Sequence, residues 1–193
     1  MITRRGFLRT TLVAAGMQAG APAHGSVRSL LAPPIHIIAL AGCGEGELFC
    51  GALPQRAQRF SLDVGDVLQG LAAGGGADPG CTCLGLTRDS DHLLIRQILI
   101  ERDSTEIYFG RHQFTRGGWR HDLHAPSTMI ASLGRALAAP SAGWPAVVAA
   151  HASAIATSPD RREQRIFVSP ASPAPTGPDC LVSWAYRLGA APA

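Results

Sequence analysis

The sequence predicts an α+β protein, in which strands and helices occupy separate stretches of the chain. Strand-like segments cluster in its middle, two segments with helical spacing follow them, and more strand-like segments close it. An α/β fold would instead alternate strands with helices. The 193 residues are enough for one domain with a core of its own. We therefore expect a single domain with a central antiparallel β-meander and two or three helices.

The first predicted strand is the apolar segment 35–41, which contains three isoleucines and lies between Pro34 and Gly42. A helix is predicted to begin near Ser61 and to end at the glycines of 74–76. Its apolar residues recur at helical spacing, and they are Val64, Val67, Leu68 and Leu71.

The middle of the chain predicts the meander. Segments 92–101 and 105–110 are rich in Ile, Leu, Tyr and Phe, and a polar turn separates them. Segments 111–115 and 119–123 flank Gly117-Gly118 and predict a second hairpin. Successive hairpins of this kind build an antiparallel sheet.

Two helices and two closing strands are predicted after the meander. The helices cover 126–140 and 144–157, and prolines mark their ends. Segments 164–169 and 180–188 predict strands, and the proline-rich stretch 170–178 between them excludes regular structure.

The N-terminus resembles a twin-arginine export signal. Residues 3–9 read Thr-Arg-Arg-Gly-Phe-Leu-Arg, an apolar stretch follows at 10–20, and small residues suited to signal peptidase end it. The resemblance implies export by the twin-arginine machinery and a periplasmic location. It divides the chain into a signal at 1–23, a linker at 24–34, the domain at 35–188 and a tail at 189–193. The residues that carry the signal are Arg4, Arg5, Phe7, Leu8, Ala21 and Ala23.

An alternative concerns Cys43. The sequence Leu-Ala-Gly-Cys at 40–43 resembles a lipobox, in which the cysteine becomes lipidated and anchors the mature chain to a membrane. The twin arginines lie far ahead of this cysteine, and Pro33-Pro34 and His36 interrupt the apolar stretch before it. The sequence leaves both a periplasmic protein and a lipoprotein open.

The charge and composition exclude several classes of function. The signal holds three of the 17 basic residues and no acidic one, so the mature chain has 14 residues of each sign and no basic run. Nucleic acid is therefore not an expected partner. The chain has no lysine, which excludes a Schiff base and a Walker lysine. We expect no transmembrane span in the mature chain.

Five cysteines suggest disulfide bonds in an oxidising compartment. An odd number leaves at least one thiol outside any intramolecular pairing, and the sequence does not determine the connectivity. Four of them pair if Cys43 is lipidated. Otherwise a bridge between Cys43 and Cys50 and another from Cys81 or Cys83 to Cys180 are candidates.

Residues 38–48 resemble the first motif of S-adenosylmethionine-dependent methyltransferases, in which a strand runs into a glycine-rich turn. The resemblance implies that a cofactor approaches the backbone of this turn, with Asp63 at a suitable distance for its ribose. The chain departs from the family at Leu40, where those enzymes usually carry an acidic residue. No regular alternation of strands and helices follows, so we predict no cofactor site here.

The candidate metal ligands are His112, His121, Asp122 and His124, and zinc or copper would suit such a set. With Gly117-Gly118 as the turn, Phe114 faces His121. His112 and His121 then share one face diagonally, whereas Asp122 and His124 point to the other. A bulge at the glycines would let three ligands converge. The competing interpretation is an exposed polar hairpin.

The function that fits these observations is a non-catalytic binding or accessory subunit of an envelope complex, with a periplasmic protein as partner. The chain has no G-x-S-x-G elbow and no paired carboxylates outside polar turns. The sequence does not decide whether the protein is an enzyme, although this absence favours a binding role. The alternatives are a small metal- or cofactor-binding enzyme that uses the region of His112, His121 and His124, and a lipoprotein anchored through Cys43.

Overall fold

The computed structural model describes residues 35–54, 58–61, 80–138, 143–154, 162–170 and 174–189. The chain divides into two units, 1–31 and 32–193, and every described residue belongs to the second. The predicted signal, the linker, most of the helix expected at 61–76 and most of the tail lie outside the described residues.

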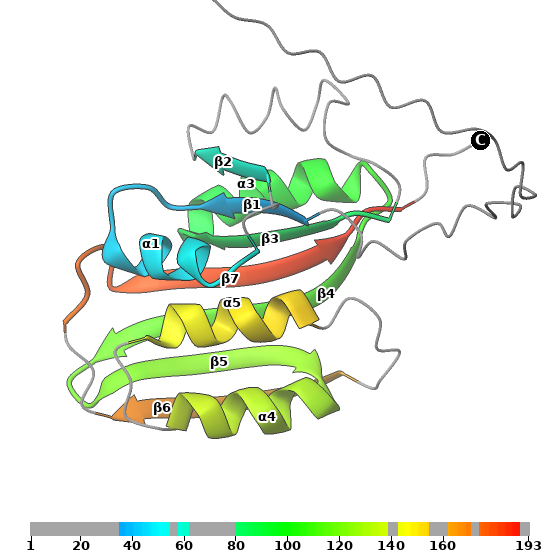
Figure 1. The fold of residues 1–193 in the computed structure, drawn as a ribbon. Helices are drawn as coiled ribbons and strands as arrows, with labels where there is room; N and C mark the ends of the chain where they lie inside the picture. Colours follow the sequence, from blue (N-terminus) through cyan, green and yellow to red (C-terminus); the bar gives the residue numbers. More distant parts are fainter. Residues whose placement is uncertain are drawn as a thin grey trace, which may run out of the picture. The chain divides into compact units, whose positions relative to one another are not determined.

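A mixed sheet of seven strands forms the centre of this unit, in the order β2-β1-β3-β7-β4-β5-β6 (Figure 1). β1 pairs in parallel with β2 and β3, and all the other pairings are antiparallel. The strands are β1 (Ile35–Ala39), β2 (Gln58–Ser61), β3 (Thr82–Thr87), β4 (Thr105–Thr115), β5 (Gly118–Pro126), β6 (Arg162–Pro170) and β7 (Cys180–Arg187).

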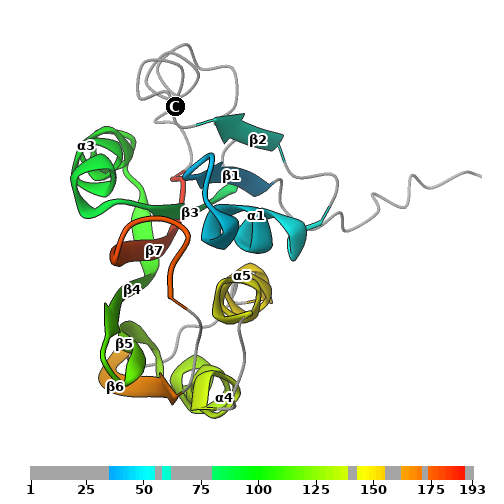
Figure 2. The same cartoon turned by 90° about the vertical axis from the view of Figure 1, so that its left-hand side faces the viewer.

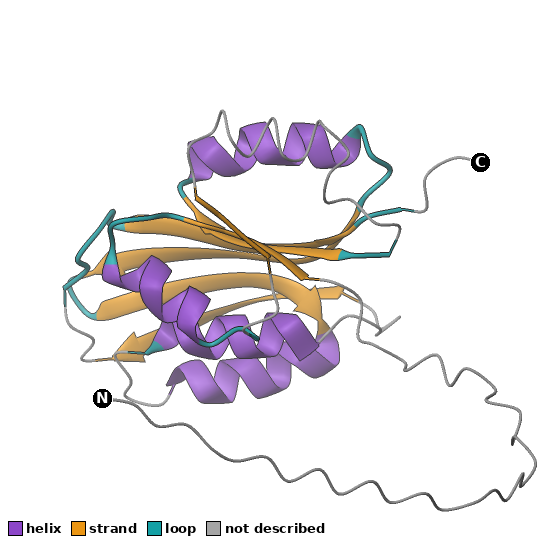
Figure 3. Ribbon diagram, turned by 45° about the horizontal axis from the view of Figure 1, so that its top comes forward, coloured by secondary structure: helices purple, strands orange, loops and turns teal. Residues whose placement is uncertain are grey.

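The described helices cover the two faces of the sheet unequally. α1, α4 and α5 lie on one face, and α3 lies on the other (Figures 2 and 3). They comprise α1 (Gly44–Gly51), α3 (Asp89–Ile100), α4 (Ser127–Ala138) and α5 (Trp144–Ala154). The predicted α+β class and the single domain are confirmed, whereas the prediction of two or three helices is too low, because the described residues already form four. Among the described residues, no helix combines the length and the apolar character needed to cross a membrane.

Two hydrophobic cores form because helices cover both faces. The larger core holds side chains of α1, α4 and α5 against the inner face, among them Phe49, Leu133 and Val148. The smaller one holds Ile95 and Leu99 of α3 against β1, β3 and β7. All six residues of β3 are buried, as expected for a strand that is covered on both sides.

The strand predicted at 92–101 is wrong, because this segment forms α3. His92, Ile95 and Leu99 are its buried residues, and their spacing of three and four positions is helical. Leu93 and Leu94 are apolar but exposed, so the helical spacing of the buried residues is not visible in the sequence. The helix connects β3 to β4 across the outer face, and this burial outweighs the β-propensity of the isoleucines.

The register of the predicted hairpin is shifted by two residues. Gly118 belongs to β5 and lies opposite Thr115, so Arg116 and Gly117 form the turn. Phe114 therefore pairs with Trp119, and their rings make an edge contact at 5.6 Å between centroids. A shift of two positions leaves every side chain on its predicted face, because side chains alternate along a strand.

The remaining predicted elements agree with the structure. The segments near 35, 105, 164 and 180 form β1, β4, β6 and β7, and the two helices expected after residue 126 are α4 and α5. In the proline-rich stretch 170–178, Pro170 is the last residue of β6, and the described residues 174–178 form no helix or strand.

Candidate functional site

His112 on β4 and His121 on β5 lie directly opposite each other and are fully buried. Both point to the face that α4 and α5 cover. The ring of Trp144, at the start of α5, packs against both in tilted arrangements, with centroid distances of 4.3 Å to His112 and 5.3 Å to His121. The prediction that these two histidines share a face is confirmed, although they pair directly and not diagonally.

Asp122 and His124 lie on the opposite face of β5, so the structure does not bring the proposed metal ligands together. The Asp122 carboxylate accepts a hydrogen bond from the side-chain amide of Gln164 at 3.0 Å, and His124 is exposed. Alternation along β5 separates these two residues from His121. In the described part of the chain, no group of three histidines, cysteines or carboxylates is arranged to hold a zinc or copper ion.

The two histidines belong to a buried chain of hydrogen bonds. Their Nδ1 atoms are 2.7 Å apart. On one side, Nε2 of His112 is 2.6 Å from Oγ of Ser183, which is 2.6 Å from the Tyr108 hydroxyl. On the other side, Nε2 of His121 is 3.0 Å from Oγ of Ser169, which bonds the carbonyl of Leu137.

The carbonyl at the end of this chain fixes the direction of every bond in it. Since a carbonyl only accepts, Ser169 donates to Leu137, and the Ser169 oxygen accepts from Nε2–H of His121. Nδ1 of a neutral His121 is then an acceptor, so His112 donates to it from Nδ1. Because a neutral His112 that donates from Nδ1 can only accept at Nε2, the Ser183 hydroxyl donates to Nε2. The Ser183 oxygen then accepts from the Tyr108 hydroxyl.

Burial keeps both histidines neutral. Burial first, and the neighbouring His121 second, hold the pKa of His112 well below its usual range. Burial alone lowers the pKa of His121 to about 4. Burial also raises the pKa of Tyr108, against the opposing effect of its bond to Ser183. Every ring nitrogen of the pair is engaged inside the core, so neither histidine offers a free ligand atom to a metal.

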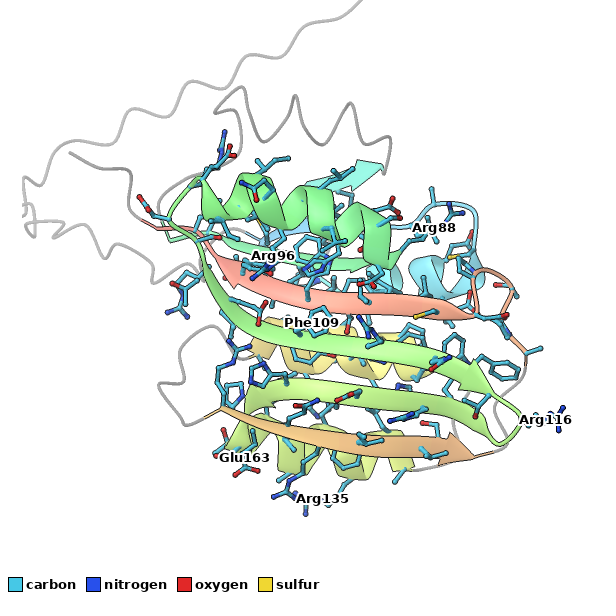
Figure 4. The ribbon with its side chains drawn as sticks, turned by 180° about the vertical axis from the view of Figure 1, so that it is seen from behind. Arg88, Arg96, Phe109, Arg116, Arg135 and Glu163 are labelled. Atoms are coloured by element: carbon cyan, nitrogen blue, oxygen red, sulfur yellow. The ribbon has the colours of Figure 1, made fainter. Side chains whose placement is uncertain are left out.

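A second polar network joins the sheet to α3 on the outer face. Nε2 of His92 lies 3.3 Å from the Tyr186 hydroxyl, which donates to Oε2 of Glu106 at 2.9 Å. Arg162 donates to Oε1 of Glu106 at 2.7 Å and to its backbone carbonyl at 3.1 Å. These bonds tie α3, β4, β6 and β7 together. In Figure 4, α3 lies over the upper strands while the outer faces of β5 and β6 carry no helix.

The glycine-rich turn after β1 places three glycines in different roles. Gly42 has φ +73°, which a side chain rarely adopts, and it makes the turn out of the strand. Gly44 lets the Thr176 side chain approach, because a Cβ here would lie 2.9 Å from its hydroxyl oxygen. A Cβ at Gly46 would collide with the Leu40 carbonyl, so this glycine allows α1 to pack against the end of β1.

The N-terminus of α1 is occupied by the chain itself. Gly44 N–H donates to the Thr176 hydroxyl oxygen at 2.7 Å. Thr176 in turn donates its backbone N–H to Oε1 of Glu45 at 3.0 Å and its hydroxyl to Oε2 at 2.9 Å. In dinucleotide-binding folds, the corresponding helix N-terminus binds a phosphate. Here the loop before β7 takes that place.

A cavity of about 380 Å³ lies beside this turn, at the carboxyl end of β1. It extends along α1 to Arg59 of β2. The Arg59 guanidinium donates to the Cys50 carbonyl at 3.1 Å. Asp63, the acidic residue noted in the sequence, lies outside the described residues. The lining residues are Ala39, Leu40, Ala41, Gly46, Glu47, Cys50, Gly51 and Arg59.

No disulfide bond joins any of the five cysteines, all of which the structure describes, so the disulfide expectation is not met. Cys43 and Cys50 lie at the two ends of α1, and burial raises the pKa of both thiols. Cys81 and Cys83 are buried in the α3-side core, and their mutual hydrogen bond and burial raise the pKa of Cys83. Cys180, at the start of β7, also has its pKa raised by burial.

Cys43 is the N-cap of α1 and is almost completely buried. Lipoprotein processing would make Cys43 the first residue of the mature chain and would remove β1. That strand pairs with β2 on one side and with β3 on the other. Its loss would remove an interior strand of the sheet together with both of its ladders.

The hydrogen-bond partners of the two histidines and of Glu45 were not predicted from the sequence. Tyr108, Ser169 and Ser183 occupy inward-facing positions on three different strands, and Thr176 comes from a distant loop. A serine between buried apolar neighbours, as in Leu-Val-Ser-Trp-Ala at 181–185, was the available signal that a buried polar partner exists.

No family model, no curated protein and no solved structure matches this chain.

Proposed function

We propose that this chain is an exported, non-catalytic binding protein that takes a small ligand in the cavity at the carboxyl end of β1. The cavity is the single observation on which the proposal rests. Its volume of about 380 Å³ falls within the range of small-molecule sites, which is roughly 300–1,000 Å³. Small side chains and glycines line most of it, so the backbone itself is open to a ligand.

The position of the cavity in the sheet also supports a binding role. In open sheets, ligands commonly bind beyond the carboxyl ends of parallel strands. β1 and β2 are parallel neighbours, and the residues that line the cavity come from the end of β1, from α1 and from β2. The cavity lies beside the turn that leaves β1.

The alternative of a metal-dependent enzyme at the histidines has less support. His112 and His121 are buried, neutral and bonded at every ring nitrogen, whereas His124 lies on the other face. A catalytic zinc needs three converging ligands and an open position for water. We likewise favour a protein without a lipid on Cys43, because processing there would remove β1.

Filling the cavity tests the binding proposal. Gly51 lines the cavity, and a Cβ at this position meets nothing within 4 Å, so Gly51→Phe adds a ring there without a backbone clash. Gly117→Phe is the matched control, since Gly117 is equally open and lies in the β4–β5 turn. Both variants are to be screened with the wild type for thermal stabilisation by a library of small metabolites.

We expect at least one compound to stabilise the wild type and Gly117→Phe but not Gly51→Phe. A library without any such compound, or a compound that stabilises all three proteins equally, contradicts the proposed site.

Export has its own test. The double variant Arg4→Lys/Arg5→Lys removes the arginine pair while keeping its charge, and we expect it to remain in the cytoplasm in a host with a twin-arginine system. The intact mass of the exported wild type should correspond to a chain that begins at His24. A lipidated chain that begins at Cys43 would instead support the lipoprotein alternative.

A further inference from the structure

The cavity beside α1 has one charged side chain of each sign at its edge. Glu47 lies in the first turns of α1, and Arg59 lies on β2. Both side chains are exposed, and no ion pair joins them in the described structure. The bond from Arg59 to the Cys50 carbonyl uses one of its five N–H groups and holds the guanidinium at the cavity.

We infer that the ligand is a small zwitterion of the amino-acid or short-peptide class, with its carboxylate on Arg59 and its ammonium group on Glu47. The inference rests on the proposed function and names the class of ligand for the same cavity. A guanidinium binds a carboxylate with two parallel hydrogen bonds, and a carboxylate accepts from an ammonium group. A ligand with both charges would therefore satisfy both side chains at once.

The walls of the cavity favour an apolar portion of limited size between the two charged ends. Alanine, leucine and glycine residues make up most of the lining, at positions 39–41, 46 and 51. Among the described lining residues, no side chain other than those of Glu47 and Arg59 is charged, and none carries an amide that would bind a polar side chain of the ligand. A ligand with a short aliphatic side chain fits this surface.

A phosphate-rich ligand fits the same region poorly. The helix N-terminus that would bind a phosphate is closed by Thr176, which accepts from Gly44 N–H. Beside it, Glu45 already accepts two hydrogen bonds from Thr176 and places a carboxylate at the turn. Among the described residues of the lining, Arg59 is the one cationic side chain. In the described lining of the cavity, a nucleotide would therefore meet one positive side chain, Arg59, and one negative side chain, Glu47.

Two matched series of probes test the assignment by calorimetric titration of the mature protein. The first is the dipeptide Ala-Leu, its N-acetyl form and its C-terminal amide, and the second is leucine, N-acetyl-leucine and leucine amide. We expect a zwitterion to bind about tenfold more tightly than either blocked form, because each block removes one charge-assisted contact.

Two variants assign the charges to their residues. In Arg59→Gln, the zwitterion and its amide should bind equally, since the carboxylate has lost its partner. In Glu47→Gln, the zwitterion and its N-acetyl form should bind equally. Arg116→Gln, at the β4–β5 turn (Figure 4), and Glu101→Gln, which follows α3, are the matched controls and should keep the wild-type preference.

The outcomes separate this inference from the proposed function. Equal binding of all three members of a series by the wild type, or no binding of either series, overturns the zwitterion assignment. If another compound still stabilises the wild type but not Gly51→Phe, the cavity remains a binding site for a different class of ligand. If Gly51→Phe binds the zwitterion as the wild type does, both proposals fail.

Discussion

Nδ1 of His112 and Nδ1 of His121 are 2.7 Å apart across the β4–β5 ladder, and one proton lies between them. That bond is the centre of a chain that runs from the Tyr108 hydroxyl to the Leu137 carbonyl with every donor pointing the same way. Because it is buried and fully paired, the chain stabilises the packing of β4, β5, β6 and β7 under α4 and α5.

Acid should destabilise the protein through His121. Its pKa is about 4 in the folded protein and about 6.5 in an unfolded chain. Between these values the unfolded chain binds a proton that the folded protein does not, so stability is lost as pH falls from 6.5 to 4. The loss from this residue is about 3 kcal/mol.

Urea unfolding at several pH values between 7 and 4 measures this dependence. His121→Gln should show a shallower fall in the free energy of unfolding than the wild type. His124→Gln removes an exposed histidine from the same strand and should keep the wild-type slope. Identical slopes for His121→Gln and the wild type would contradict the assignment.

The direction of the hydrogen-bond chain predicts that removing a hydroxyl at one end lowers the free energy of unfolding more than removing one at the other end. Tyr108→Phe removes a donor and leaves an unused acceptor on Ser183, at a cost of about 1 kcal/mol. Ser169→Ala leaves Nε2–H of His121 without an acceptor in the core, at a cost of about 2–3 kcal/mol. Urea unfolding at pH 7 measures both.

Ser132→Ala is the control for the serine variant, since its hydroxyl bonds only carbonyls of its own helix. It should change the free energy of unfolding by less than about 0.5 kcal/mol. A larger loss of unfolding free energy for Tyr108→Phe than for Ser169→Ala would contradict the donor direction assigned to the hydrogen-bond chain.

Gly110 leaves the space in which the Tyr108 hydroxyl meets Ser183. A Cβ at Gly110 would collide with that hydroxyl and lie 2.9 Å from Oγ of Ser183. Gly110→Ala should cost about 2–3 kcal/mol. Adding Tyr108→Phe to Gly110→Ala should recover part of this loss, because it removes the hydroxyl that the new Cβ meets. The two changes should therefore not be additive in a double-mutant cycle of unfolding free energies. Gly117→Ala, which meets nothing within 4 Å, is the control.

Thr176 should stabilise the turn after β1. Thr176→Val keeps the shape of the side chain but removes the hydroxyl that accepts from Gly44 and donates to the buried Glu45. We expect a loss of about 1–2 kcal/mol in the free energy of unfolding, and almost none for Thr176→Ser. Equal stability of Thr176→Val and Thr176→Ser would show that these hydrogen bonds contribute nothing net.

The sequence predicted the candidate site only in part. It singled out the glycine-rich turn and the histidines, because both are local patterns. It missed Arg59 and Thr176, which come to the turn from β2 and from the loop before β7. The helix α3 was missed because its apolar residues are too numerous to show their period.

What the sequence by itself determined is what depends on neighbours along the chain. Alternation along a strand placed His112 and His121 on one face and Asp122 and His124 on the other, and this held although the hairpin register moved by two residues. The spacing of apolar residues and prolines located five of the seven described strands and two of the four described helices, and it missed α1, α3, β2 and β3.

The tertiary structure alone decided which distant segments meet. β7, the last strand in the chain, inserts between β3 and β4 and brings Ser183 to His112, while α5 places Trp144 over both histidine rings. Burial under that helix makes the pair neutral, and the loop before β7 closes the N-terminus of α1. These contacts join residues up to 132 positions apart, and no local period encodes such pairings.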